Sequence, residues 1–83
     1  MNQNKAIITV NLIMQNSSCD KEVPLDISAN ELCDAIFQKF LPEQYNDMNQ
    51  YYLKSERPIA LLRGEKTLRN DGIRDGSVIN ITR

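Results

Sequence analysis

The sequence contains no histidine, and this absence removes most of the usual catalytic chemistry. Histidine is a very common general base at neutral pH and the commonest protein ligand for transition metals. Neither a Ser-His-Asp triad nor a Cys-His pair can therefore form. The acidic residues are scattered along the chain, and no cluster of them has the spacing of a metal site. We therefore predict that the protein is not an enzyme and has no catalytic residue, no cofactor and no metal site.

Cysteine is also scarce, with two residues in 83. Two cysteines cannot form a disulfide framework, and the spacing of Cys19 and Cys33 matches no zinc motif. Cys33 falls in an apolar helical stretch and is expected to be a small buried hydrophobic residue. Cys19 falls in a predicted turn, where we expect an exposed thiol without a neighbouring group to activate it.

Long hydrophobic runs are missing as well. The N-terminus, residues 1–5, is polar, and the apolar run at residues 6–14 includes Thr9 and Asn11. That run is far shorter than the roughly 20 residues of a membrane helix, and it lacks the small-residue cleavage site of a signal peptide. The sequence therefore predicts a cytoplasmic location without direct membrane insertion.

Charge of one sign is not in large excess, because the formal net charge is −1. It is nevertheless uneven: residues 1–53 carry a net charge of −4, and residues 54–83 a net charge of +3. The basic residues that suggest a nucleic-acid site have acidic residues between them and no aromatic residue: Arg57, Arg63, Lys66, Arg69, Arg74 and Arg83. Single-strand binders place stacking aromatics beside the charge. We therefore favour a solvated surface first, a protein-facing patch second, and predict no nucleic-acid partner.

A phosphate-binding loop is excluded on similar grounds. The segment 64–67 reads Gly-Glu-Lys-Thr, but the motif requires a glycine directly before its lysine and another five residues earlier. Glu65 and Ala60 occupy those two positions. The segment is better explained as a loop beside a short strand.

The sequence predicts a polar tail over residues 1–5, followed by two strands that form a hairpin. Residues 6–14 are rich in β-branched side chains, and alternate apolar residues share one face: Ile8, Val10, Leu12 and Met14. Residues 15–20 have turn composition. Residues 21–27 alternate again, with Val23, Leu25 and Ile27 on one face. Because Pro24 cannot donate to a ladder, its nitrogen should face away from the first strand or lie at a bulge.

A helix follows the hairpin. Ser28 and Glu31 have the spacing of a capping box. The next residues repeat at intervals of three and four and form one apolar stripe: Leu32, Cys33, Ile36, Phe37, Phe40 and Leu41. Pro42 should end the helix near Leu41. We interpret residues 43–50, which are polar, as a loop.

The rest of the chain reads as short strands and a connector. Residues 51–55 predict a strand with Tyr51 and Leu53 on its inner face, and residues 59–62 form a brief apolar piece. Residues 67–76 predict a compact connector with two glycines. Residues 77–82 close the chain as a strand, with Ile79 and Ile81 pointing inward.

This order predicts a single domain over residues 6–83 of the α+β class. The first and last strands are the most apolar, so we expect them at the centre of the sheet, adjacent and parallel. The sheet should be mixed, with four to five strands and one main helix packed across one face.

The second half of the chain resembles ubiquitin-like proteins. The resemblance is carried by Thr67-Leu68, Gly72-Ile73, Asp75-Gly76-Ser77 and the alternating Ile79 and Ile81. Together with the hairpin and the capped helix, it implies a β-grasp fold over the chain after Lys5. Within that superfamily the sequence is most similar to the bacterial YukD/EsaB proteins. The similarity lies in the size and in Gly64-Glu65 followed by Leu68, Gly72-Ile73 and Gly76.

That resemblance implies a cytosolic accessory or regulatory component of a type VII secretion system. Its partners would be proteins, such as cytosolic parts of a membrane secretion complex. The protein itself would be a monomer or a weak homodimer. The alternatives are another bacterial ubiquitin-like adaptor or regulator unrelated to secretion, and a sulfur carrier or conjugated modifier.

Four residues are candidates for protein contact: Tyr52, Lys54, Arg63 and Lys66. Tyrosine is favoured at interfaces because it buries a large area at small entropic cost. By alternation with Tyr51, Tyr52 should point outward, beside Lys54. A partly buried aromatic on an edge strand remains an equal alternative for Tyr52.

The C-terminal residues argue against a conjugated modifier. Modifiers and carriers of this superfamily need a flexible tail that ends in Gly-Gly, whereas this sequence ends Ile-Asn-Ile-Thr-Arg and its last glycine is Gly76. Ile81 is expected in the sheet, Thr82 is β-branched, and Arg83 is bulky. We therefore expect no covalent attachment through the C-terminus.

Overall fold

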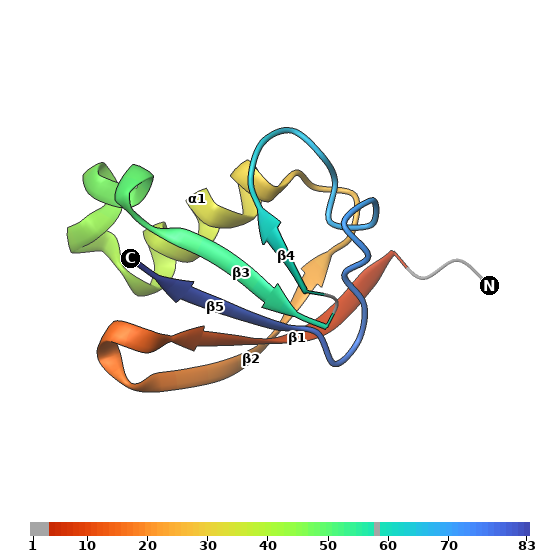
Figure 1. Cartoon of the computed structure of the whole chain (residues 1–83), viewed down its shortest axis with the longest axis horizontal. Helices are drawn as coiled ribbons and strands as arrows, with labels where there is room; N and C mark the ends of the chain where they lie inside the picture. The colour runs from red at the N-terminus through yellow and green to blue at the C-terminus, as the bar shows by residue number, and fades with distance from the viewer. Residues whose placement is uncertain (1–3, 58) are drawn as a thin grey trace.

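Five strands form one mixed sheet in the order β2-β1-β5-β3-β4 (Figure 1). The computed structural model describes residues 4–57 and 59–83. The elements in chain order are β1 (Lys5–Leu12), the 3-10 turn η1 (Ile13–Gln15), β2 (Ser17–Pro24), α1 (Ala29–Phe40), the 3-10 helix η2 (Pro42–Gln50), β3 (Tyr52–Glu56), β4 (Ile59–Leu62) and β5 (Val78–Thr82). The polar tail predicted at residues 1–5 lies mostly outside the described residues.

The two most apolar strands lie together at the centre of the sheet. β1 and β5 are parallel, with Val10 opposite Ile79 and Leu12 opposite Ile81. Each is also paired on its other side with an antiparallel neighbour, β2 and β3. Ile79 and Ile81 are completely buried. The prediction of adjacent parallel first and last strands is confirmed.

The hairpin turn lies earlier in the chain than predicted. β1 ends at Leu12, and the turn is made by η1 and by Asn16, which has a φ of 51°. Met14 was predicted on the buried face of the strand, which is wrong, because it lies in η1 and is 43% exposed. Cys19 was predicted in an exposed turn, which is also wrong: it lies in β2, half-buried and packed against the core. The 3-10 turn explains both differences, since it takes up the residues that would have prolonged the first strand.

The predicted helix is confirmed, with its capping box. Ser28 Oγ accepts the N–H of Glu31 at 3.0 Å, and a Glu31 carboxylate oxygen accepts the N–H of Ser28 at 3.2 Å. These bonds satisfy donors that the first helical turn leaves free. Leu32, Ile36 and Phe37 of α1 are buried against the sheet, and Leu41 after it is buried as well. Cys33 and Phe40 of the same stripe are half-buried.

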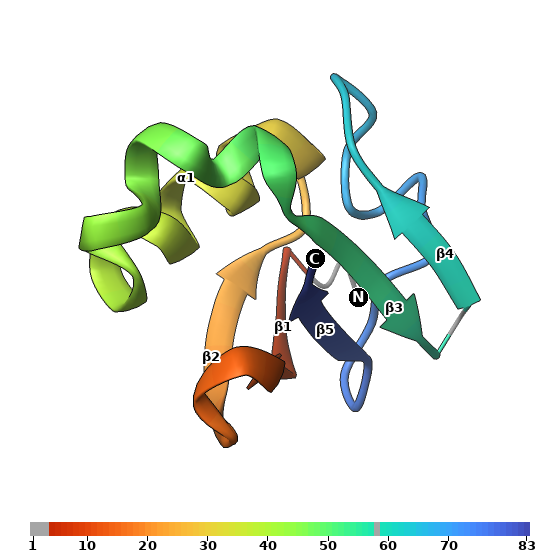
Figure 2. The ribbon, with the colours of Figure 1, turned by 60° about the vertical axis from the view of Figure 1, so that its left-hand side comes forward.

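We predicted a loop for the polar segment after the helix, which is wrong. The segment forms the 3-10 helix η2. It begins at Pro42, whose missing N–H costs nothing at a helix start. Tyr45 and Met48 pack partly against the core, and the Tyr45 hydroxyl donates to the Asp34 carboxylate of α1. η2 therefore lies against α1 and extends the helical layer (Figure 2). The segment has few apolar residues, so its sequence showed no helical pattern.

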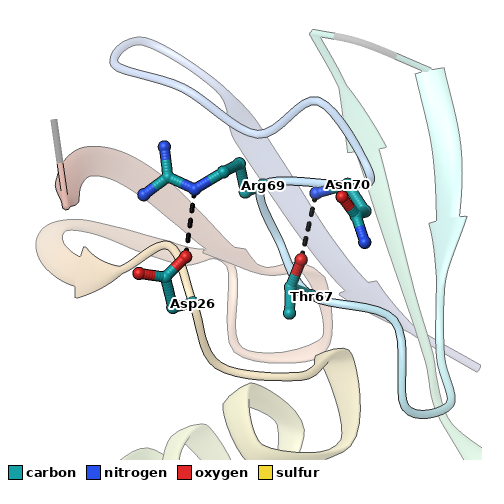
Figure 3. A network of polar contacts seen from close by, with 4 residues as sticks. All are labelled: Asp26, Thr67, Arg69 and Asn70. Atoms are coloured by element: carbon teal, nitrogen blue, oxygen red, sulfur yellow. Dashed lines mark hydrogen bonds and ion pairs between the residues drawn. The ribbon is translucent and has the colours of Figure 1, made fainter. Parts of the chain in front are cut away.

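The connector between β4 and β5 is tied to the start of the helix. Leu68 donates its N–H to Ile27 O and Arg69 donates its N–H to Leu25 O, each at 2.9 Å. Figure 3 shows two further contacts: Arg69 Nε donates to Asp26 Oδ1 at 3.0 Å, and Asn70 N–H donates to Thr67 Oγ1 at 3.2 Å. The predicted connector is therefore ordered by contacts with the segment between β2 and α1.

Candidate functional site

The outer face of the sheet, which lies away from α1, presents the aromatic side chain predicted there. In β3, Tyr51, Leu53 and Ser55 are buried, while Tyr52 and Lys54 alternate with them and are exposed. Tyr52 is 46% exposed, and Lys54 Nζ lies 6.0 Å from the centroid of its ring. The outward orientation of Tyr52 and its proximity to Lys54 agree with the sequence prediction.

Two apolar residues of β4 extend this exposed surface. Leu61 pairs with Lys54 and is 45% exposed, and Ile59 pairs with Glu56 and is 90% exposed. The sequence showed residues 59–62 as an apolar piece but gave no reason to place Leu61 beside Lys54. Only the strand register puts the two residues side by side.

Arg63 joins the same region, directly after β4. Tyr52, Leu61 and Arg63 line a depression of about 190 Å³ together with Cys33 and Met48. This depression lies on the side of the sheet that faces α1, where β3 and β4 meet α1 and η2. We call Tyr52, Lys54, Leu61 and Arg63 the β3–β4 surface.

Lys66, the fourth residue predicted from the sequence, does not line this depression. Its Nζ lies 3.5 Å from Asp71 Oδ1, and its carbonyl accepts the N–H of Ala29 at 3.0 Å. Lys66 therefore belongs to the connector that supports the start of α1. Of the four candidates, the structure brings Tyr52, Lys54 and Arg63 together and leaves Lys66 apart.

The centre of the outer face is occupied by a ladder of polar side chains. Asn11 Nδ2 donates to Asn80 Oδ1, and Asn80 Nδ2 donates to Glu56 Oε2, each at 2.8 Å. This chain of contacts links β1, β5 and β3. Covering polar groups that already satisfy one another gains little free energy. The most favourable contact area on this face therefore lies toward β3 and β4.

Three basic residues of the second half, Lys66, Arg69 and Arg83, make contacts within the domain. Arg69 pairs with Asp26 and Lys66 with Asp71, and the Arg83 guanidinium carbon lies 5.0 Å from the centroid of the Tyr51 ring. These cations are used in contacts at separate places.

The surroundings of the Cys33 thiol do not activate it. Partial burial, with a smaller contribution from the charge of Asp34, raises the pKa of the Cys33 thiol from its ordinary value, which disfavours the nucleophilic thiolate. No group of three or more His, Cys, Asp or Glu residues in 4–57 and 59–83 could hold a metal ion. Among these same residues, no helix is both long and apolar enough to span a membrane.

The fold defines the class of protein as a ubiquitin-like β-grasp domain. A de novo protein designed on the basis of ubiquitin has a TM-score of 0.72 to this structure at 18% identity, over 99% of this chain and 93% of the design. The C-terminal ubiquitin-like domain of mouse tubulin-specific chaperone e has a TM-score of 0.73 at 10% identity, over 98% and 88% of the two chains. At such low identity, both similarities concern the fold alone.

The family is given by the sequence. The model of the YukD family, described as "WXG100 protein secretion system (Wss), protein YukD", matches residues 7–81. The chain therefore belongs to the YukD family, whose members are components of the WXG100, or type VII, secretion system. No curated protein matches the sequence. The family match favours a secretion component over an adaptor unrelated to secretion.

Proposed function

We propose that this chain is a protein-binding accessory or regulatory component of the WXG100 secretion system, which works in the cytoplasm and docks through its β3–β4 surface. The observation that carries the proposal is the exposure of Tyr52 and Leu61 side by side with Lys54 and Arg63. Aromatic, aliphatic and arginine side chains are the usual centre of a protein interface. The depression beside them would accept a side chain of the partner, and that partner would be a cytosolic part of the secretion machinery.

We further propose that the chain acts without covalent attachment. The three glycines of residues 1–83 lie at turns with positive φ, before β5. Thr82 is the last residue of β5 and pairs with Tyr52 of β3. Extending this segment into an activating enzyme would break the hydrogen bonds of a central strand. Intact-mass analysis of the protein from its native cell tests this proposal, and a thiocarboxylate, adenylate or isopeptide adduct would contradict it.

Site-specific photocrosslinking tests the docking surface. A benzoylphenylalanine at position 61 should crosslink to another component of the secretion system in living cells. The same group at position 43, where Glu43 is exposed on η2, is the matched control. Adducts of equal strength from both positions, or from position 43 alone, would contradict the assignment of this surface.

Substitutions connect the surface to export. Tyr52→Ala should weaken binding to the crosslinked partner about tenfold, because truncated interface tyrosines commonly cost more than 1 kcal/mol. Leu61→Glu should reduce export of WXG100 proteins, whereas Ile13→Glu, at a residue 53% exposed on the hairpin turn, should not. Thermal unfolding of each variant verifies that the fold is intact. If Tyr52→Ala folds normally and retains full affinity, the β3–β4 surface is not the docking site.

A further inference from the structure

The opposite edge of the sheet is formed by β2, whose outward backbone groups pair with no strand within residues 4–57 and 59–83. β2 pairs with β1 and is the last strand in the sheet order, below α1 in Figure 2. Leu25 donates its N–H to Asn4 O at 2.8 Å, so by alternation the nitrogen of Pro24 faces away from β1, as the sequence predicts. The same alternation turns the N–H and C=O groups of Ser18, Asp20 and Glu22 outward. β2 therefore offers three N–H donors along its outer edge.

An apolar groove runs beside this edge, between β2 and α1. Its volume is about 230 Å³. β2 contributes Val23, and α1 contributes Leu32, Ala35 and Ile36. The side chains of β2 that point toward the groove are those at odd positions, including Lys21 and Val23. A strand added to the edge of β2 would place every second side chain over this groove.

Two lysines lie together at the end of the groove near Phe40. Lys21 Nζ of β2 is 5.1 Å from the centroid of the Phe40 ring, and Lys39 Nζ of α1 is 6.0 Å from it. Neither lysine forms a salt bridge with any residue in 4–57 or 59–83. The pKa of Lys21 is lowered because the Lys39 amine lies within hydrogen-bonding reach, with smaller effects from desolvation and from the like charge of Lys39. The fold thus holds two like charges together beside the groove, which Glu22 of β2 also lines.

We propose that the groove binds an extended acidic–apolar segment of a partner protein, which pairs as an added strand with the free edge of β2. Peptides commonly bind in this way, with backbone hydrogen bonds for affinity and pockets for alternate side chains. Apolar residues of the segment lie over Val23 and Ile36, and its acidic residues lie against Lys21 and Lys39. Charge complementarity selects this occupant, since an acid on the partner relieves the repulsion between the lysines.

The other face of β2 restricts the partner further. Asp20 and Glu22 point to the outer face of the sheet, where Asp20 Oδ1 accepts a hydrogen bond from the Thr9 hydroxyl at 2.8 Å. Acidic residues of the added strand are therefore favoured only at the positions that face the groove. The site lies at the opposite edge of the sheet from the β3–β4 surface and does not depend on the function proposed for that surface.

A peptide of defined pattern tests the proposal directly. The probe is a fluorescent, end-capped peptide of sequence Val-Thr-Val-Thr-Glu-Thr-Glu-Thr, with a Lys-for-Glu peptide of the same alternation as control. The Glu peptide should bind at least tenfold more tightly than the Lys peptide, and its affinity should fall as salt rises. In ¹⁵N-labelled protein, the largest amide shifts should fall on Ser18, Asp20 and Glu22. Equal binding of the two peptides, or shifts centred on β3 and β4, would overturn the proposal.

Charge variants test the role of the lysines. Lys21→Glu/Lys39→Glu should weaken binding of the Glu peptide about tenfold or more, and the milder Lys21→Gln/Lys39→Gln should weaken it several-fold. Arg57→Glu/Arg74→Glu makes the same change in net charge at two exposed residues that do not line the groove and should leave binding unchanged. Equal loss in both charge-reversed proteins would overturn the site. Shifts at β2 that grow with protein concentration in the absence of peptide would overturn it too, because a second copy would then be the occupant.

Discussion

Removal of the Phe37 ring is the sharpest test of how the helix is held on the sheet. Phe37 is completely buried, and its ring centroid lies 5.2 Å from that of Tyr51, with the planes at 60°. Truncation of a fully buried phenylalanine to alanine costs about 3–5 kcal/mol, from lost transfer free energy and the cavity left behind. A domain of 83 residues has a total stability of about 4–12 kcal/mol. Phe37→Ala should therefore remove a large part of the stability.

Urea unfolding followed by circular dichroism measures this loss. With a denaturant slope of about 1–1.5 kcal/mol/M, the midpoint of Phe37→Ala should fall by about 2–5 M. If that protein is unfolded in buffer, Phe37→Leu provides the measurement, with an expected loss of about 1–2 kcal/mol.

Phe40→Ala is the matched control on the same helix. Phe40 is half-buried, and its ring contacts the ammonium groups of Lys21 and Lys39. Its truncation should cost about 1–2 kcal/mol, clearly less than the loss at Phe37. Equal losses at the two positions, or a Phe37→Ala midpoint close to wild type, would refute the packing described for α1.

Three further substitutions address the thiol, the helix cap and a turn. The pKa of the Cys33 thiol is raised above its ordinary value of 9.0, so its contribution to stability is fully present below pH 9 and is lost as pH rises through the folded-state pKa. Between pH 7 and pH 10, the free energy of unfolding in urea should therefore decrease less for Cys33→Val than for wild type. Ser28→Ala should cost about 1 kcal/mol by removing the cap, measured by thermal unfolding, and a loss below a few tenths would contradict the role of the capping box. Gly76→Ala should cost about 1–3 kcal/mol because Gly76 has a φ of +87°, although a Cβ there meets no atom within 4 Å; an unchanged melting temperature would show that the turn relaxes.

The helix and the central strands could be predicted because their patterns are local. Leu32, Ile36 and Phe37 recur at helical spacing behind a capping box, and Ile79 and Ile81 alternate as in a strand with one face buried. Each pattern requires the same secondary structure whichever partner covers its apolar face. The outward orientation of Tyr52 followed from the same alternation.

Local sequence patterns predicted the wrong structure where tertiary contacts determine the conformation. η2 has little apolar periodicity, and its position depends on the packing of Tyr45 and Met48 and on the contact of the Tyr45 hydroxyl with Asp34. Met14 continued the strand pattern, but the chain had to turn before it so that β2 could pair with β1. In both cases a tertiary contact overrode the local preference.

The sequence by itself determined the class of fold, since periodicity, capping and turn residues act over a few positions, and the family followed from its match to the YukD model. Only the tertiary structure decided which side chains meet. Leu61 lies beside Lys54 because of the register between β3 and β4, and Lys66 is separated from them by its pairing with Asp71. Lys21 and Lys39 come together over Phe40 because α1 crosses the sheet next to β2. Contacts of this kind depend on strand register and helix packing, which are set by the whole core and not by neighbouring residues in the chain.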